Sequence, residues 1–231
     1  MMTDSMTAVR PEQQLARNGL YRKIADAEFV ATAESAIAAS FSADDSSAQS
    51  RCALTDMTPV VRGGFRGKAS ADHLQALGLP IPEKPNQALT TDKGETVLRL
   101  SNTEYWLLGS VTDFGQTVAD VRSQAMPAAD CYPLFCNDSH AWLTLSGEHC
   151  AAVMAKLCGV DMRAEVFPSG SIAQTSVARI NAIVVSHSVG GKAVFSLLFD
   201  TGYHAYMWDV LLDASSEFGG VAAGVTPLMA D

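Results

Sequence analysis

Two glycine-lysine pairs are the first features of this sequence that could do chemistry, because a glycine-rich loop that ends in lysine can hold a phosphate. Residues 63–68 read GGFRGK. The phosphate-binding loop needs a glycine where Arg62 stands and a serine or threonine where Ala69 stands, and Gly191-Lys192 fails in the same way. Both pairs are therefore interpreted as turns. No G-x-G-x-x-G segment follows a predicted strand, so a Rossmann dinucleotide site is not expected.

Cysteine, histidine and serine residues could bind a metal ion or act as nucleophiles, but their spacing favours neither role. Cys150 and Cys158 would lie on one helix face about 12 Å apart, which is too far for both to bind one ion. Cys131 and Cys136 lack the spacing of a zinc knuckle, and Ser146 lacks the glycine that precedes a nucleophilic serine. No motif surrounds the histidines, which are His73, His140, His149, His187 and His204. The sequence therefore predicts no catalytic, cofactor-binding or metal-binding residue on this chain.

Aromatic residues stand at matching ends of two halves of the sequence: Tyr105, Trp106, Tyr203, Tyr206 and Trp208. Such side chains could stack on a flat ligand such as a pterin, or anchor a partner subunit. Packing in the core is the simpler interpretation, and we favour it.

The composition limits the kinds of partner. Hydrophobic residues make up 48% of the 231 residues, charged residues make up 18%, and the formal net charge is −9. This balance argues against nucleic acid or an anionic membrane as the main partner, because phosphate binding needs excess lysine and arginine. No apolar run approaches the roughly 18 residues of a membrane span, and no signal peptide is visible. We expect a cytoplasmic protein without disulfides, because the five cysteines are odd in number and irregularly spaced.

The elements that must position these residues form a weak internal repeat of roughly 80 to 90 residues. The first half, residues 50–125, and the second half, residues 140–220, each read β-α-β-β-α, with an extra strand in the second. Gly67 and Gly147 break the first strand of each half, and Leu107-Leu108 correspond to Leu197-Leu198. This order predicts an α+β fold with helices packed on mainly antiparallel sheets. Residues 126–139 are predicted to be a linker and residues 221–231 a tail.

The first 49 residues differ from the rest and are predicted to form an N-terminal helical arm. Residues 12–29 read as a helix, and residues 40–50, SFSADDSSAQS, read as a flexible linker. The arm has too few large apolar residues to offset its ordering entropy alone. We therefore expect it to make few contacts with its own domain and to bind a partner through Leu15, Leu20, Tyr21, Ile24 and Phe29.

With this pattern laid out, the chain resembles the gamma subunit of heterotetrameric sarcosine oxidase and, more distantly, the glycine-cleavage T-protein. The resemblance covers about residues 50 to 220, and an ordered set of segments carries it. These segments are residues 101–109, 142–147, 157–161, 167–170 and 173–180. No single one of them is decisive.

The resemblance implies a T-protein-like fold and a role as a non-catalytic subunit beside alpha, beta and delta subunits. It implies that FAD, FMN, NAD and tetrahydrofolate are held by those partners, with no cofactor on this chain. Such a complex oxidises an N-methyl amine and passes the one-carbon unit to tetrahydrofolate. The sequence does not match the T-protein segment with the catalytic aspartate, nor the K-G-C-Y-x-G-Q motif of related iron–sulfur assembly factors, nor the T-protein's C-terminal barrel. The alternative is a free folate-binding one-carbon transfer protein. Which N-methyl amine is used, and whether the complex is an oxidase or a dehydrogenase, stays open.

Overall fold

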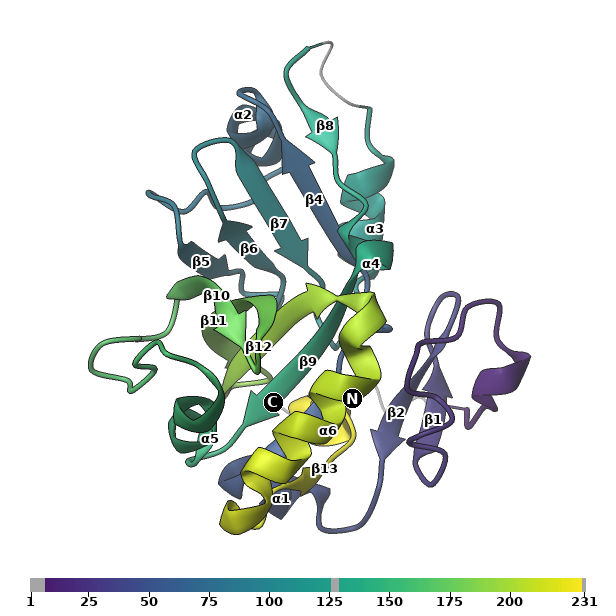
Figure 1. Cartoon of the computed structure of the whole chain (residues 1–231). Helices are drawn as coiled ribbons and strands as arrows, with labels where there is room; N and C mark the ends of the chain where they lie inside the picture. The colour runs from purple at the N-terminus through teal and green to yellow at the C-terminus, as the bar shows by residue number, and fades with distance from the viewer. Residues whose placement is uncertain (1–6, 126–128, 230–231) are drawn as a thin grey trace.

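Two β-sheets organise the computed structural model, which describes residues 7–125 and 129–229 (Figure 1). The first sheet has the strand order β5-β6-β7-β4-β8, and all its pairs are antiparallel. Its strands are β4 (Arg62–Arg66), β5 (Gln87–Thr90), β6 (Thr96–Arg99), β7 (Glu104–Leu108) and β8 (Tyr132–Pro133). The fold class is thus the α+β class predicted from the sequence.

The second sheet has the order β10-β11-β12-β9-β3-β13, and only the β13–β3 pair is parallel. Its strands are β3 (Ala53–Asp56), β9 (His140–Ser146), β10 (Ile172–Val177), β11 (Ile180–Val189), β12 (Lys192–Asp200) and β13 (Val221–Ala222). The edge strands of the two sheets touch, because the backbone N–H of Ala88 donates to the carbonyl of Gly170 at 2.8 Å.

Helices cover the outer face of each sheet, and the inner faces pack together. α2 (Ser70–Ala76) and α3 (Gln116–Ser123) cover the first sheet, while α5 (Cys150–Leu157) and α6 (His204–Ser215) cover the second. Side chains alternate along each strand, as the β-pleat requires. On β7, Tyr105 and Leu107 face the helices, whereas Trp106 and Leu108 join the core between the sheets. The result is four layers in the order α-β-β-α.

The predicted repeat is present in the strand topology. One half runs β4-α2-β5-β6-β7-α3 and the other runs β9-α5-β10-β11-β12-α6. The register agrees, since Gly63 pairs with Leu107 just as Leu143 pairs with Leu197. The sequence analysis was wrong in giving the second half an extra strand, because β5 is the matching strand of the first half. A four-residue strand just after Pro85 gave too short an alternating pattern to detect.

Each half also lends a strand to the other half. β3 comes just before β4 of the first half but pairs with β9, and β8 comes just before β9 of the second half but pairs with β4. Gly67 and Gly147, with φ of 137° and 105°, mark the equivalent crossing points. A Cβ on Gly67 would lie 2.0 Å from the carbonyl oxygen of Asp130, and one on Gly147 would lie 2.4 Å from that of Arg51. Only glycine allows the two chain segments to approach so closely.

The prediction of an N-terminal helical arm is wrong. Within residues 7–49 the chain forms a short 3-10 helix at Pro11–Gln13, the hairpin of β1 (Glu28–Ala31) and β2 (Ala36–Ser40), and the start of α1 (Asp45–Arg51). The stretch predicted to be a flexible linker is ordered, because Asp45 accepts hydrogen bonds from the backbone N–H groups of Phe41, Ser42 and Gly224. A buried carboxylate with three N–H donors fixes the backbone strongly.

The predicted partner-binding set is not one exposed surface. Leu20, Ile24 and Phe29 are 0%, 4% and 5% exposed and belong to the core beside α6 and the second sheet. Tyr21 is half-buried, and Leu15 alone of the set is highly exposed, at 83%. The apolar residues of this segment are buried against their own chain. This burial offsets the entropy cost of ordering the segment, so no partner is needed for it.

The predicted linker and tail are structured as well. β8 and α4 (Cys136–Ser139) lie within residues 126–139, although residues 126–128 fall outside the described part. In the last segment, β13 pairs with β3, and α7 (Thr226–Met229) buries Leu228 completely. These pairings join residues far apart in sequence, and local propensity gives no sign of them.

Candidate functional site

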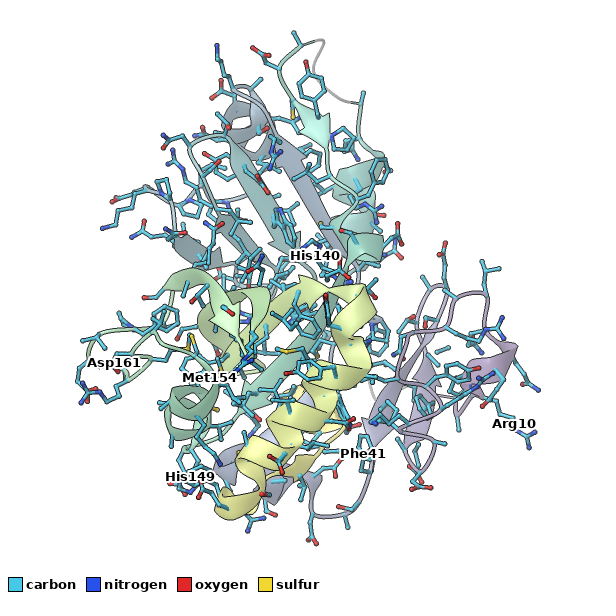
Figure 2. The ribbon with its side chains drawn as sticks, viewed as in Figure 1. Arg10, Phe41, His140, His149, Met154 and Asp161 are labelled. Atoms are coloured by element: carbon cyan, nitrogen blue, oxygen red, sulfur yellow. The ribbon has the colours of Figure 1, made fainter. Side chains whose placement is uncertain are left out.

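A groove where the two sheets meet is lined in part by aromatic side chains. Two adjoining cavities of ≈ 480 and ≈ 390 Å³ share His140, Gln174 and Ile183, and we call them together the inter-sheet groove. Figure 2 shows His140 at the centre of the molecule, where the two sheets meet. The remaining lining comes from β4, β7, β10, β11, β12 and α4 and from residues next to β6 and α4: Arg66, Leu100, Glu104, Trp106, Leu134, Phe135, Cys136, Ser139, Thr175, Ser176, Asn181, Ala182 and Leu198.

His140 connects the walls of the groove. Its ring meets the Trp106 ring edge-on, with centroids 4.7 Å apart. Its Nδ1 lies 2.8 Å from the hydroxyl of Ser139. Burial, and then the nearby Arg62 guanidinium, lower the pKa of His140, while Asp200 and Glu104 partly oppose this. The imidazole is therefore neutral at pH 7 and offers hydrogen bonds rather than a positive charge.

Glu104 holds the polar end of the groove in place. Its carboxylate accepts hydrogen bonds from Arg66 Nε at 2.9 Å and from the indole Nε1 of Trp106 at 3.1 Å. The Arg66 side chain is 61% exposed, so this ion pair contributes little to stability, and its geometric effect is to orient Trp106. The groove thus holds a largely buried indole ring next to a carboxylate.

The rim of the groove is apolar and exposed. Phe135, which begins the turn into α4, is 72% exposed, and Tyr132 on β8 is 60% exposed. Both lie on the segment that carries β8, the strand that pairs with β4 of the first half, and leads into α4. Exposed aromatic residues that flank a groove are typical of sites that contact another molecule.

Arg62 supports this rim from inside the protein. It is fully buried, and its guanidinium donates to the backbone carbonyls of Thr58, Val60, Asn137 and His140 at 2.7–3.0 Å. Burial lowers the pKa of Arg62 to about 10, so it stays charged at pH 7. The sequence analysis used Arg62 only to reject a phosphate loop. The sequence signal for this supporting role was an arginine at the start of an apolar strand.

His187 belongs to a hydrogen-bonded chain between the sheets. Its Nδ1 lies 3.2 Å from the Thr96 hydroxyl on β6, and its Nε2 lies 2.8 Å from the Ser196 hydroxyl on β12. Ser196 also accepts from the indole of Trp142 at 2.8 Å. Burial lowers the pKa of His187 to about 4, so the ring is neutral. Because every polar atom of the ring is engaged, its role is structural.

The five cysteines are all buried free thiols. Burial raises the pKa of Cys136 to about 11 and raises that of Cys150 further still, so neither is a thiolate at pH 7. Within residues 7–125 and 129–229, no group of three or more histidine, cysteine or carboxylate side chains is placed to hold a metal ion.

The five aromatic residues named from the sequence do not form one site. Tyr105, Trp106 and Trp208 are buried in three different clusters, whereas Tyr203 and Tyr206 are 48% and 45% exposed on α6 and the turn before it. Only Trp106 lines the inter-sheet groove. Core packing was therefore the correct interpretation for three of the five.

The four-layer fold and its swapped strands define a T-protein-like protein. The family model of the GCVT N-terminal domain matches residues 85–230, and the chain belongs to this family. No curated protein matches the chain by sequence. Within the described residues, no helix has the length and apolar character needed to cross a membrane.

Two solved structures share the fold at low sequence identity. A chain of the heterotetrameric sarcosine oxidase from Corynebacterium sp. U-96, in complex with pyrrole 2-carboxylate, matches with a TM-score of 0.59 and 22% identity, over 76% of this chain and 91% of that one. The glycine cleavage system aminomethyltransferase T from Bartonella henselae matches with a TM-score of 0.65 and 16% identity, over 90% of this chain. The present chain spans 58% of that aminomethyltransferase.

Proposed function

We propose that this chain is a non-catalytic, gamma-type subunit of a cytoplasmic, flavin-dependent sarcosine oxidase or a related N-methyl amino-acid oxidase or dehydrogenase. The observation that carries the proposal is the extent of the structural match, which covers 91% of a sarcosine oxidase chain but 58% of an aminomethyltransferase. In this proposal FAD, FMN, NAD and tetrahydrofolate belong to alpha, beta and delta partner subunits, and this chain holds none of them.

The chemistry of the described residues supports a binding role rather than a catalytic one. All five cysteines are buried, and burial raises the pKa of Cys136 and Cys150, so these thiols are neutral, as is His187. His140 is a neutral ring fixed between Trp106 and Ser139. The exposed rim of Phe135 and Tyr132 beside the inter-sheet groove supplies the apolar anchors that subunit interfaces use. We assign the partner contact to this rim, in place of the N-terminal residues that the sequence suggested.

Co-purification tests the assignment. The tagged chain, expressed from its native locus, should elute with larger flavoprotein subunits. The Phe135→Ser variant should weaken that association roughly tenfold or more. Val166→Ser is the matched control, because Val166 is also an exposed apolar residue, at 58%, but lies on the loop before β10. Elution of the wild-type chain alone, near its own 24.5 kDa, would falsify the proposal.

A free folate-binding one-carbon transfer protein is the second candidate. The family match favours it, as does the pairing of the Trp106 ring with the Glu104 carboxylate in the groove, since a flat ring with N–H donors could bind both. Calorimetric titration of the isolated chain with tetrahydrofolate decides the matter. Saturable heat that Trp106→Leu abolishes supports this candidate, and an absence of heat at millimolar ligand removes it.

A further inference from the structure

A second concave site lies on the outer side of the second sheet, at the start of α5. We call it the α5 cavity, and its volume is ≈ 360 Å³, within the range of small-molecule sites. Its walls come from the start of α5, the loop before β10, and the strands β11 and β12. It shares no lining residue with the inter-sheet groove. In Figure 2, His149 marks the start of α5 and Asp161 lies on the loop.

The apolar walls of the α5 cavity are built from buried side chains. Phe167 and Phe195 are 7% and 8% exposed, and their rings meet edge to face with centroids 6.0 Å apart. Met162, which is 3% exposed, adds a thioether to the same wall. Aromatic rings and a methionine sulfur both make favourable contacts with a further aromatic ring. The walls therefore suit a ligand with a flat aromatic body.

A buried hydroxyl without a hydrogen-bond partner faces this space. Ser186 on β11 lines the cavity and is 9% exposed. Along β11, Val184 belongs to the outer cluster and Val185 to the core between the sheets, so the Ser186 side chain points to the outer side, where the cavity lies. Its hydroxyl makes no hydrogen bond within residues 7–125 and 129–229, although its backbone N–H and carbonyl are both paired. A polar group of a ligand would satisfy the hydroxyl.

The start of α5 supplies unpaired donors on another wall of the cavity. His149 precedes the helix and makes no side-chain cap. Ala151, the second residue of α5, lines the cavity, and its backbone N–H has no acceptor among the described residues. The first N–H groups of a helix point outward along its axis and, together with the macrodipole, favour an anion. A ligand carboxylate would accept from these groups.

The sheet order sets the distance between the two polar walls. β12 lies between β11, which carries Ser186, and β9, which leads into α5. Two strand spacings amount to about 10 Å. A benzene ring with polar substituents at opposite ends, extended by two hydrogen bonds of about 2.8 Å, can span such a gap. Phe195 on β12 lies beneath the middle of this span.

One charged side chain of the cavity opposes an anion. Glu148 lines the cavity, but its side chain is 70% exposed, and its Oε1 lies 3.4 Å from Nε2 of His149. Water and salt screen a carboxylate that is this exposed, so its repulsion is weak. Removing its charge should therefore strengthen the binding of an anion rather than abolish it.

We propose that the α5 cavity binds a small aromatic carboxylate that carries a hydroxyl group at the far end of its ring. The ring packs on Phe167 and Phe195, the carboxylate accepts from the first N–H groups of α5, and the hydroxyl group bonds to Ser186. The proposal does not depend on the subunit assignment.

Calorimetric titration of the full-length chain with complete and incomplete ligands tests the proposal. The complete probes are 4-hydroxybenzoate and 4-hydroxyphenylacetate, and at least one should bind with a Kd below about 5 mM. Benzoate lacks the hydroxyl group and should bind roughly fivefold more weakly, while 4-hydroxybenzyl alcohol lacks the charge and should bind roughly tenfold more weakly. Absence of binding by both complete probes, or an alcohol that binds as tightly as the acids, overturns the proposal.

Variants assign each polar contact to its wall. Ser186→Ala should weaken 4-hydroxybenzoate roughly fivefold and leave the affinity for benzoate unchanged. Ala151→Asp places a carboxylate at the start of α5, which is favourable for the helix but repels the ligand, so affinity should fall roughly tenfold or more. Ala71→Asp is the matched control, because Ala71 is the second residue of α2, the equivalent helix of the first half. Glu148→Gln should raise the affinity a few-fold at low ionic strength.

Backbone amide chemical shifts give a readout that does not depend on affinity alone. The amide resonance of Ala151 should move on saturation with 4-hydroxybenzoate, and that of Ala71 should stay in place. Unchanged affinity in both Ser186→Ala and Ala151→Asp, or saturable binding without a shift at Ala151, places the ligand elsewhere and overturns the proposal.

Discussion

The first and second halves share one topology but differ in how much of the chain covers them. Outside the first sheet, α2 and the eight-residue α3 cover a small cluster around Phe65 and Leu107. Outside the second sheet, the twelve-residue α6 is joined by Leu20, Phe29 and other N-terminal residues in a larger cluster. The repeat thus preserves strand order and turn glycines, while the added segments enlarge the buried cluster outside the second sheet. The exposed aromatic rim lies on and just after β8, at the edge of the first sheet.

Removing residues 1–45 should have the largest effect on stability, because these residues cover the second sheet and not the first. The truncation deletes β1, β2, Leu20 and the buried Asp45, all of which belong to the covering of the second sheet. We expect the shortened chain to lose its cooperative unfolding transition, measured by circular dichroism during heating. A truncated chain that melts at the wild-type temperature would show that the second half does not depend on this segment.

The two equivalent glycines offer a sharper comparison. Gly147→Ala should destabilise the protein by about 4 kcal/mol, because the new Cβ meets the backbone of Arg51 and displaces β3, which lies between β9 and β13. Gly67→Ala should cost less, because it displaces β8, a two-residue edge strand that can move. Urea unfolding measures both variants.

Gly78→Ala is the control for backbone strain. Its φ is +79°, but no atom lies within 4 Å of the added Cβ, so it isolates the cost of the left-handed conformation at about 1 kcal/mol. Equal losses of unfolding free energy for alanine at Gly67, Gly78 and Gly147 would mean that contact with the crossing strands contributes nothing to those losses.

Substitution of two leucines tests which residues of the N-terminal segment stabilise the second sheet by covering it. Leu20→Ala should lower the free energy of unfolding by about 3 kcal/mol, because Leu20 is completely buried in the second half's outer cluster. Leu15→Ala should change it by less than about 0.5 kcal/mol, because Leu15 is 83% exposed. Similar values for both would contradict the burial of this segment.

His187 gives the smallest expected effect, as a pH dependence of the second half. Its pKa is lowered to about 4 in the folded protein, against about 6.5 when unfolded, so the unfolded chain binds more protons between these values. Stability should therefore fall on acidification, by about 1 kcal/mol between pH 6 and pH 5. In the first half, the strand register places Leu100 at the position equivalent to His187. Leucine does not titrate, so the first half has no matching pH dependence at this position.

His187→Gln should flatten this slope, as measured by urea unfolding at both pH values. His149→Gln, which changes a histidine whose side chain is 37% exposed, is the control and should leave the slope unchanged. A wild-type slope that persists in His187→Gln would assign the acid sensitivity to other groups.

The parts of the fold that sequence predicted are those with local signals. Alternation along Tyr105-Trp106-Leu107 and glycine at positions 67 and 147 are readable within a few residues, and they gave the repeat and the sheet class. The N-terminal segment failed because its loose helical spacing was weaker than its tertiary contacts with α6 and the second sheet. β13 depends on a parallel partner at the other end of the chain, and nothing local specifies it.

The candidate sites were less predictable than the fold. His140, Trp106 and Gln174 come from three strands, and only their packing brings them to one groove. Ser186 and Ala151 line different walls of the α5 cavity, and neither residue lies in a recognisable motif. Sequence could name the aromatic and histidine residues, but the sheet register decides which of them meet.

The exchange of β3 and β8 between the halves has a consequence for synthesis of the chain. β3 leaves the ribosome about 90 residues before β9, its antiparallel partner, and its other neighbour, β13, emerges later still. Pairing at such separation makes folding slow, and the unpaired edge of β3 stays available to other strands during translation. The first sheet can close as soon as β8 has emerged, whereas the second sheet closes only after β13, near the end of the given sequence, has been made.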